Sequence, residues 1–182
     1  MKKKLLQNIF IFIICTAFSL SARADIRTVF SDARGLSVSY RPDNLRADSV
    51  RTNDKTYLRF SADLHTTIAH AGEPSIPLRS VLFAAPSGER PSLTLSVHGE
   101  TFLENAIPLP VPHLVRDTQG FSIEKYHEDP ARYAMSGFQP EAFATLRSQY
   151  DFGGVTVWEL TFAPVRFDTR NLSASVLDSL AV

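Results

Sequence analysis

The stretch GGVTVWELTFAPVRF, residues 153–167, decides the fold class of this chain. It begins with a Gly-Gly pair, which is a turn signal, and continues with side chains that alternate along an extended backbone. One face carries Trp158, Leu160 and Phe162, and the other carries Val155, Val157, Glu159 and Thr161. Alternation at period two is typical of a half-buried β-strand. The stretch therefore predicts a turn followed by a strand.

Five further stretches carry strand signals. Alternation recurs in residues 36–41, 57–64, 92–98 and 172–176, and residues 81–85 form a short continuous apolar run. The continuous run predicts a strand that is buried on both faces. Turns rich in proline and glycine separate the strands, at residues 41–44, 71–74, 85–88 and 151–154. Many short strands with this punctuation predict an all-β fold, either an antiparallel β-sandwich or an open barrel.

Residues 108–140 interrupt the strand pattern. This segment holds five prolines and two glycines. Because residues that precede proline are driven to extended or polyproline conformations, we expect one long irregular loop here. Long loops in compact domains are commonly functional, so this segment is the best candidate for a working surface. Short helical turns are possible at residues 129–135, with Pro130 in the first helical position, and at residues 140–146.

The N-terminus has the layout of a secretory signal peptide. Three lysines precede an apolar run of about a dozen residues, and Ala-Arg-Ala at residues 22–24 resembles a cleavage site. The run is shorter than the roughly 20 residues of a membrane span, although an uncleaved anchor is the alternative. We therefore expect residues 1–24 to be removed, leaving one domain, residues 25–182, without a membrane span. This domain is predicted to be secreted, periplasmic or on the cell surface.

Cleavage changes the charge and removes the one cysteine. The full chain has 19 basic and 19 acidic residues, and this balance argues against a nucleic-acid partner. Removing four cations and no acid leaves a net charge of −4 and no cysteine. Thiol catalysis, disulfides and thiolate metal sites are thereby excluded from the exported chain.

No other motif points to an enzyme. The chain has no phosphate-binding loop and no nucleophile elbow, and its histidines have poor metal spacing. We therefore predict no cofactor, no metal and no catalytic residues. A hydrolase with a serine or carboxylate centre has no motif to support it.

Arginine dominates the remaining cations. After cleavage, 13 of the 15 basic residues are arginines. A guanidinium fork suits a partner with a carboxylate pocket, whereas the simpler interpretation is compositional bias. The long loop carries two of these arginines, Arg116 and Arg132.

The chain resembles the gingipain-type propeptide, the N-terminal prosegment of the C25 family of cysteine peptidases. The resemblance lies first in Gly-Glu-Pro-Ser-Ile-Pro at residues 72–77, followed by an apolar strand at 81–85, a turn at 86–88 and an alternating strand at 93–97. Residues 153–157 and 162–167 resemble the start and the continuation of the family's closing strands. The resemblance covers residues 29–182.

This resemblance implies a non-catalytic, secreted prosegment that inhibits a C25-type cysteine peptidase domain, in cis or in trans, and assists its folding. In arginine-specific members a loop of the prosegment can offer a basic residue to the specificity pocket. By position the candidate for this inhibitory role is Arg116, although a solvated loop arginine is the alternative. Asp168-Thr169 departs from the family's usual Asn-Pro after the closing strand.

Two further questions stay open at the level of sequence. The chain ends without a peptidase domain or a basic processing site, so we expect either a fragment of a longer zymogen or a free-standing relative. The alternative function is an exported β-sandwich adhesion or envelope-assembly module that has no protease partner.

Overall fold

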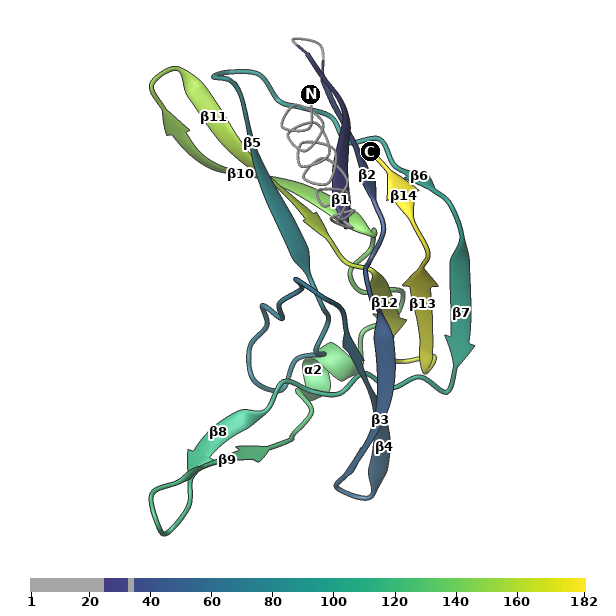
Figure 1. The fold of residues 1–182 in the computed structure, drawn as a ribbon. Coiled ribbons are helices and arrows are strands. Elements are labelled where there is room, and N and C mark those ends of the chain that lie inside the picture. Colours follow the sequence, from purple (N-terminus) through teal and green to yellow (C-terminus); the bar gives the residue numbers. More distant parts are fainter. Residues whose placement is uncertain (1–24, 33–34) are drawn as a thin grey trace, which may run out of the picture.

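A computed structural model describes residues 25–32 and 35–182 (Figure 1). The predicted signal peptide, residues 1–24, lies outside the described residues. Nearly all regular structure is strand, which confirms the all-β prediction. The strands are β1 (Ile26–Asp32), β2 (Gly35–Tyr40), β3 (Arg46–Thr52), β4 (Lys55–Ser61), β5 (Arg79–Pro86), β6 (Ser96–Val97), β7 (Glu100–Glu104), β8 (His113–Arg116), β9 (Ser122–Lys125), β10 (Ala144–Phe152), β11 (Val155–Phe162), β12 (Val165–Asp168), β13 (Ser173–Leu177) and β14 (Leu180–Ala181). Among the described residues, no helix is long and apolar enough to cross a membrane.

The strands form several open antiparallel sheets. The orders are β1-β2-β14-β6, β10-β11-β5 and β12-β13-β7, with two separate hairpins, β3-β4 and β8-β9. β11 leads almost directly into β12, so one continuous stretch of chain contributes to two sheets (Figure 1). The hairpins β8-β9 and β10-β11 extend away from the body of the molecule in the same view.

Two apolar clusters hold the sheets together. The larger cluster joins the sheet of β1 and β2 to the sheet of β10 and β11, and its buried members are Val38, Tyr40, Phe143, Ala144, Leu160, Phe162, Leu177 and Leu180. The rings of Tyr40 and Phe162 stack at its centre, with 4.4 Å between their centroids. The smaller cluster packs β4 against β12 and β13, and its buried members are Phe60, Ala106, Val165, Phe167 and Ala174. Alternate side chains of β11 and β12 therefore supply both cores.

Several local predictions are confirmed. The strand predicted from residues 155–162 is β11, whose buried face carries Leu160 and Phe162. The expected helical turn is α2 (Pro130–Tyr133), with Pro130 at its start and Asp129 as the N-cap. The Asp129 side chain accepts from the backbone N–H of Ala131 at 2.9 Å and so satisfies a donor that the helix leaves free.

Four other predictions need correction. Residues 108–140 contain the hairpin β8-β9 as well as α2, because strand formation resumes directly after the last of the clustered prolines. The stretch 140–146 forms no helix, since β10 begins at Ala144 and pairs with β11. The run 81–85 lies in β5 but is not buried on both faces. Leu82 is exposed, because the face of β5 that packs against the larger apolar cluster is the opposite one, which carries Val81 and Phe83. Of residues 92–98, only Ser96–Val97 form a strand, β6.

Asp168 links the loop after α2 to the turn between β12 and β13. Its buried carboxylate accepts from the backbone N–H of Asn171 at 3.0 Å, from Asn171 Nδ2 at 2.8 Å and from Gly137 N–H at 3.2 Å. The hydrogen bond from the Asn171 backbone is the main reason that the pKa of Asp168 lies below its usual value. The ionised carboxylate therefore stabilises the folded chain.

We expect Asp168→Ala to lower the free energy of unfolding by about 1–3 kcal/mol at pH 7, because three partly buried hydrogen bonds to a charged acceptor are lost. Since the folded pKa is lowered, the stabilisation is complete above the unfolded pKa of about 4 and is lost as the pH falls through the folded value. Urea unfolding at pH 7 and at about pH 3 measures both effects. Glu89→Ala, at an exposed carboxylate, is the control. A pH-independent difference between wild type and Asp168→Ala would contradict the role of the charge.

Candidate functional site

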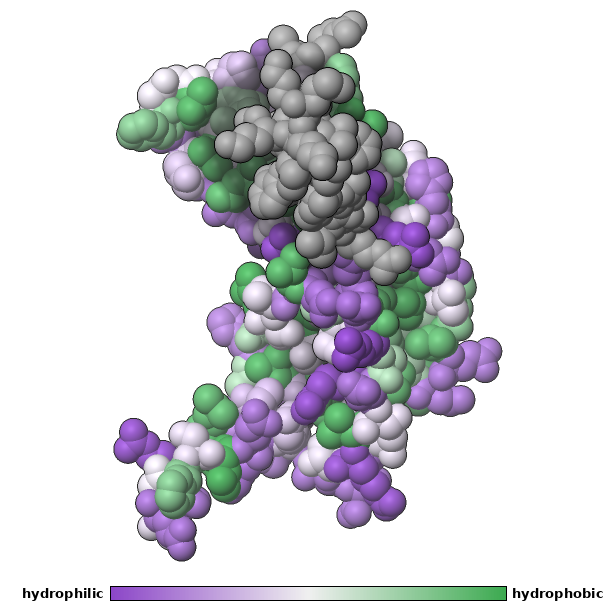
Figure 2. All heavy atoms as spheres, viewed as in Figure 1, coloured by the Kyte–Doolittle hydropathy of each residue, from purple (hydrophilic) through white to green (hydrophobic). Residues whose placement is uncertain are grey.

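The hairpin β8-β9 carries the arginine that the sequence singled out. Arg116 is the last residue of β8 and pairs with Ser122 of β9. It is exposed and forms none of the ion pairs found among residues 25–32 and 35–182. Figure 2 shows that the hairpin stands clear of the body at the lower left, with both apolar and polar side chains on its surface.

Arg116 shares its face of the hairpin with one apolar side chain, Leu114, and with the polar side chains of Ser122 and Glu124. Cross-strand partners share a face of a sheet, and so do residues two apart. Leu114, which is 71% exposed, therefore lies on the same face as Arg116, while Ile123 lies on the other. Phe121, at the tip, is 66% exposed. Exposed apolar groups beside a cation are typical of a protein-binding surface.

The tip of the hairpin is tightly hydrogen-bonded. Asp117 Oδ1 accepts from the backbone N–H groups of Gln119 and Phe121, at 2.9 and 2.8 Å. The N–H of Asp117 donates to the carbonyl of Phe121 at 2.9 Å, and Gly120 N–H donates to the carbonyl of Asp117 at 3.1 Å. Because an Asp side chain closes the turn in this way, the backbone directly after Arg116 is held in one conformation.

The base of the hairpin is paired with the segment Gly-Glu-Pro-Ser-Ile-Pro at residues 72–77. Gly72 N–H donates to the carbonyl of Val111, and Val111 N–H donates to the carbonyl of Glu73, both at 2.8 Å. Gly72 has φ +91, and a Cβ there would lie 3.3 Å from Asp129 N and His127 O. Only glycine tolerates both the conformation and the close approach. This segment therefore aligns the chain that enters β8 with the chain that leaves β9.

A second set of contacts braces the chain that leaves β9. Glu128 accepts from Lys55 Nζ at 2.9 Å and from the Tyr57 hydroxyl at 2.8 Å. Burial, followed by this hydrogen bond to Glu128, raises the pKa of Tyr57 to about 12. Asn53 Nδ2 donates to the carbonyl of Tyr126 at 2.5 Å. The neighbouring hairpin β3-β4 thus supports the return path of β8-β9.

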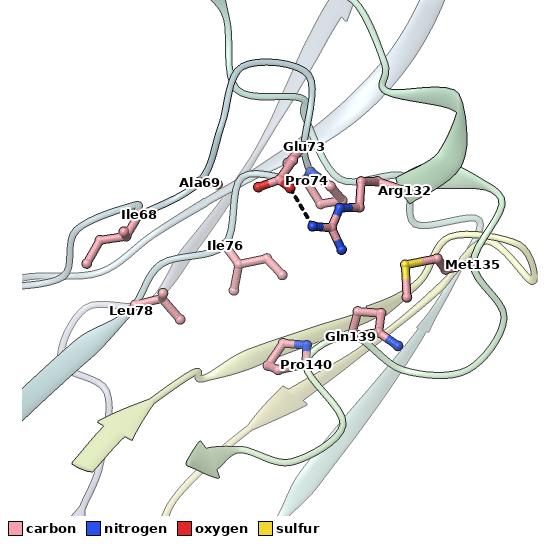
Figure 3. Close-up of a pocket in the computed structure, with 10 residues that line it drawn as sticks. All are labelled: Ile68, Ala69, Glu73, Pro74, Ile76, Leu78, Arg132, Met135, Gln139 and Pro140. Atoms are coloured by element: carbon pink, nitrogen blue, oxygen red, sulfur yellow. Dashed lines mark ion pairs between the residues drawn. The ribbon is translucent and has the colours of Figure 1, made fainter. Parts of the chain in front are cut away.

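The second loop arginine, Arg132, is placed differently. It lies on α2 beside an apolar groove of about 240 Å³ (Figure 3). The groove is lined by Ile68, Ala69, Glu73, Pro74, Ile76, Leu78, Arg132, Met135, Gln139 and Pro140. Arg132 Nη2 pairs with Glu73 Oε1 at 2.9 Å across its rim. Both loop arginines are therefore exposed, but Arg132 is held in an ion pair, whereas Arg116 forms none of the ion pairs found in the described part of the chain.

The histidines do not gather into a metal site. His65 Nε2 lies 2.6 Å from the Tyr40 hydroxyl and Nδ1 lies 2.6 Å from the carbonyl of Asp63, so both ring nitrogens have protein partners. The rings of His113 and His127 lie 6.2 Å apart at the base of the hairpin. No group of three potential metal ligands occurs in the part of the chain that the structure describes.

Comparison with known proteins identifies the family. The Propeptide_C25 family model matches residues 19–173, most of the chain. The chain belongs to the Propeptide_C25 family. This match confirms the resemblance seen in the sequence. A Propeptide_C25 domain is the propeptide of C25 peptidases, which is a non-catalytic segment.

Two solved structures have a similar fold. One is the complex of Porphyromonas gingivalis RgpB pro- and mature domains, with TM-score 0.67 and 18% identity over 87% of this chain and 81% of that chain. The other comes from a study of the zymogenic latency of gingipain K from Porphyromonas gingivalis, with TM-score 0.63 and 18% identity over 89% of this chain and 93% of that chain. None of the curated proteins matches the chain.

Proposed function

We propose that this Propeptide_C25 domain inhibits a C25-type cysteine peptidase by inserting the β8-β9 hairpin into its active-site cleft, with Arg116 in the specificity pocket. The observation that carries the proposal is the contrast between the two loop arginines. Both side chains are exposed, but Arg132 is paired with Glu73, whereas Arg116 forms none of the ion pairs found among the described residues and lies at the end of a projecting strand. An unpaired guanidinium suits a pocket that contains a carboxylate.

The strand that precedes Arg116 supports the same proposal. Within the described sheets β8 pairs only with β9, so its other edge keeps free backbone donors and acceptors. Such an edge can add to a strand of a partner, and alternate side chains then enter successive pockets. In this arrangement Arg116 and Leu114 would point to the same side of the cleft.

The proposal extends to folding and to location. A braced hairpin with a prepared geometry has little conformational entropy left to lose on binding, and it can act as a template for the cleft while the peptidase folds. The partner domain would act in cis or in trans. Residues 1–24 would direct export and residues 25–182 would form the inhibitory domain, which places the protein outside the cell, in the periplasm or on the cell surface.

The direct test adds the purified protein to an active C25-type peptidase and measures hydrolysis of an arginyl peptide substrate. We expect inhibition that saturates at one domain per peptidase. Recovery of activity after chemical denaturation of the peptidase, with and without the domain, tests the folding role. Full peptidase activity at excess domain would refute the inhibitor proposal. Specific capture of an envelope component by the domain would then support the adhesion or assembly alternative.

A further inference from the structure

An exposed arginine in a projecting hairpin is also a cleavage site for an arginine-specific peptidase. We infer that Asp117 is a positioning residue that keeps the Arg116–Asp117 peptide bond intact, by holding both sides of this bond on the same strand. The inference rests on the proposed insertion of Arg116 into the specificity pocket. It adds the reason why the hairpin would act as an inhibitor and not as a substrate.

The hairpin holds the residues on both sides of the Arg116–Asp117 bond. On one side, Arg116 pairs with Ser122 in the β8-β9 ladder. On the other side, Asp117 donates its N–H to the carbonyl of Phe121, and its side chain accepts from Gln119 and Phe121. The two anchors, Phe121 and Ser122, are consecutive residues. Cleavage would therefore leave the new ends side by side.

This arrangement favours reversal of the first chemical step. The peptidase thiolate attacks the carbonyl carbon of Arg116, the C–N bond to Asp117 breaks, and the Asp117 nitrogen takes a proton from the peptidase to leave as an amine. The products are a thioester and a free amine. If the amine stays in place, it attacks the thioester carbon and loses a proton, the thiolate leaves, and the peptide bond forms again. Hydrolysis needs a water molecule in the position that the amine occupies.

A substitution can remove the hydrogen bonds made by the Asp117 side chain, whereas the main-chain hydrogen bonds of the tip stay available in every variant. Alanine removes the acceptor of two hydrogen bonds in the tip, whereas asparagine keeps a side-chain oxygen in the same place and removes only the charge. Thr118→Ala changes the next side chain, which makes no hydrogen bond among those found in the described part of the hairpin. These three variants separate the hydrogen bonds from the charge and from the sequence of the tip.

The experiment exposes the full protein and the three variants to trypsin, a probe that cleaves after arginine and lysine, and follows the Arg116–Asp117 bond by mass spectrometry. We expect Asp117→Ala to lose this bond about ten- to a hundredfold faster than wild type, in line with the loss of two hydrogen bonds that close the tip. Asp117→Asn and Thr118→Ala should resemble wild type. Hydrogen exchange at the amides of Gln119 and Phe121 should accelerate only in Asp117→Ala.

Two outcomes would overturn the inference. If trypsin cleaves the Asp117→Ala variant as slowly as wild type, the side chain is dispensable. If it cleaves the Asp117→Asn variant as fast as the Asp117→Ala variant, the charge alone protects the bond. A variant that unfolds would also be cut at Arg147 and Arg170. In that case wild-type protein that has been cut at Arg116 is incubated again with a catalytic amount of trypsin. Mass spectrometry must then detect intact protein, which is lighter than the cut form by one water molecule; if none forms, the inference fails.

The trypsin experiment is independent of the C25 peptidase. If the Asp117 variants behave as expected while the domain leaves a C25 peptidase active, the inhibitor proposal fails, but the role of Asp117 in protecting the Arg116–Asp117 bond still holds. If the domain inhibits the peptidase while Asp117→Ala resists cleavage like wild type, only the role of Asp117 fails. The two results therefore cannot be confused.

Discussion

Arg116→Ala should weaken inhibition of an arginine-specific C25 peptidase by about a hundredfold, which corresponds to about 3 kcal/mol of binding free energy. A charged group that fills a specificity pocket is a typical energetic hot spot. Its removal also leaves the pocket carboxylate desolvated without a partner. The backbone of the hairpin should not change, because the Arg116 side chain is exposed and forms none of the ion pairs found among the described residues.

The measurement is the inhibition constant of wild type and variant against one peptidase and one substrate. Arg116→Lys keeps the charge but loses the guanidinium fork, and should give an intermediate value. Arg147→Ala removes an exposed arginine from β10 and is the matched control, with an expected change of less than about twofold, that is, under 0.5 kcal/mol. Equal inhibition by wild type and Arg116→Ala would show that the specificity pocket takes another group.

Phe162→Ala should remove about 3–5 kcal/mol from the free energy of unfolding, a large part of the 5–15 kcal/mol that is typical of a domain. Phe162 is 0% exposed. Its ring stacks on Tyr40, which belongs to a different sheet. The substitution therefore creates a cavity at the contact of two sheets and also removes an aromatic pair.

Urea unfolding followed by intrinsic fluorescence measures this loss as a shift of the midpoint at unchanged slope. Phe152→Ala is the control, because Phe152 is 77% exposed at the tip of β10-β11. Its expected effect is within about 0.5 kcal/mol. If both substitutions lowered stability equally, the assignment of the core to the contact between the two sheets would be wrong.

The strands that could be predicted are those in which the apolar residues of the sequence are also the buried residues of the structure. In β11 the buried positions, Thr156, Leu160 and Phe162, all lie on one face of the alternating sequence, since that face meets the core. β5 has a continuous apolar sequence, yet only the face that carries Val81 and Phe83 packs on the core, and Leu82 on the other face is exposed. A run of apolar residues does not encode the number of layers that will cover it.

The sequence did not predict the hairpin β8-β9. The prolines that precede β8 favour extended, unpaired chain, and this masked two four-residue strands on either side of a turn. A signal was present, because Asp117 and Gly120 bracket a tight turn between two segments capable of pairing. Short strands carry too few alternating positions for periodicity to reveal them.

For the candidate site, Arg116 was predicted from its place after the prolines and its family resemblance, and its inhibitory role stays a prediction. The contacts that prepare it were not predicted. Glu128 meets Tyr57 across 71 positions of sequence, and Glu73 meets Arg132 from a different loop. No spacing rule connects such residues, because their distance depends on how the sheets stack.

Sequence alone determined that this chain is built of strands and that its one long proline-rich segment carries two arginines, because alternation and proline content are local properties of the backbone. Only the tertiary structure decided which of these arginines is ion-paired. Pairing of residues 72–77 with the base of the hairpin brings Glu73 to Arg132 and leaves Arg116 free at the end of β8. This choice depends on long-range packing, which fixes the partners of each charge only after the chain has folded.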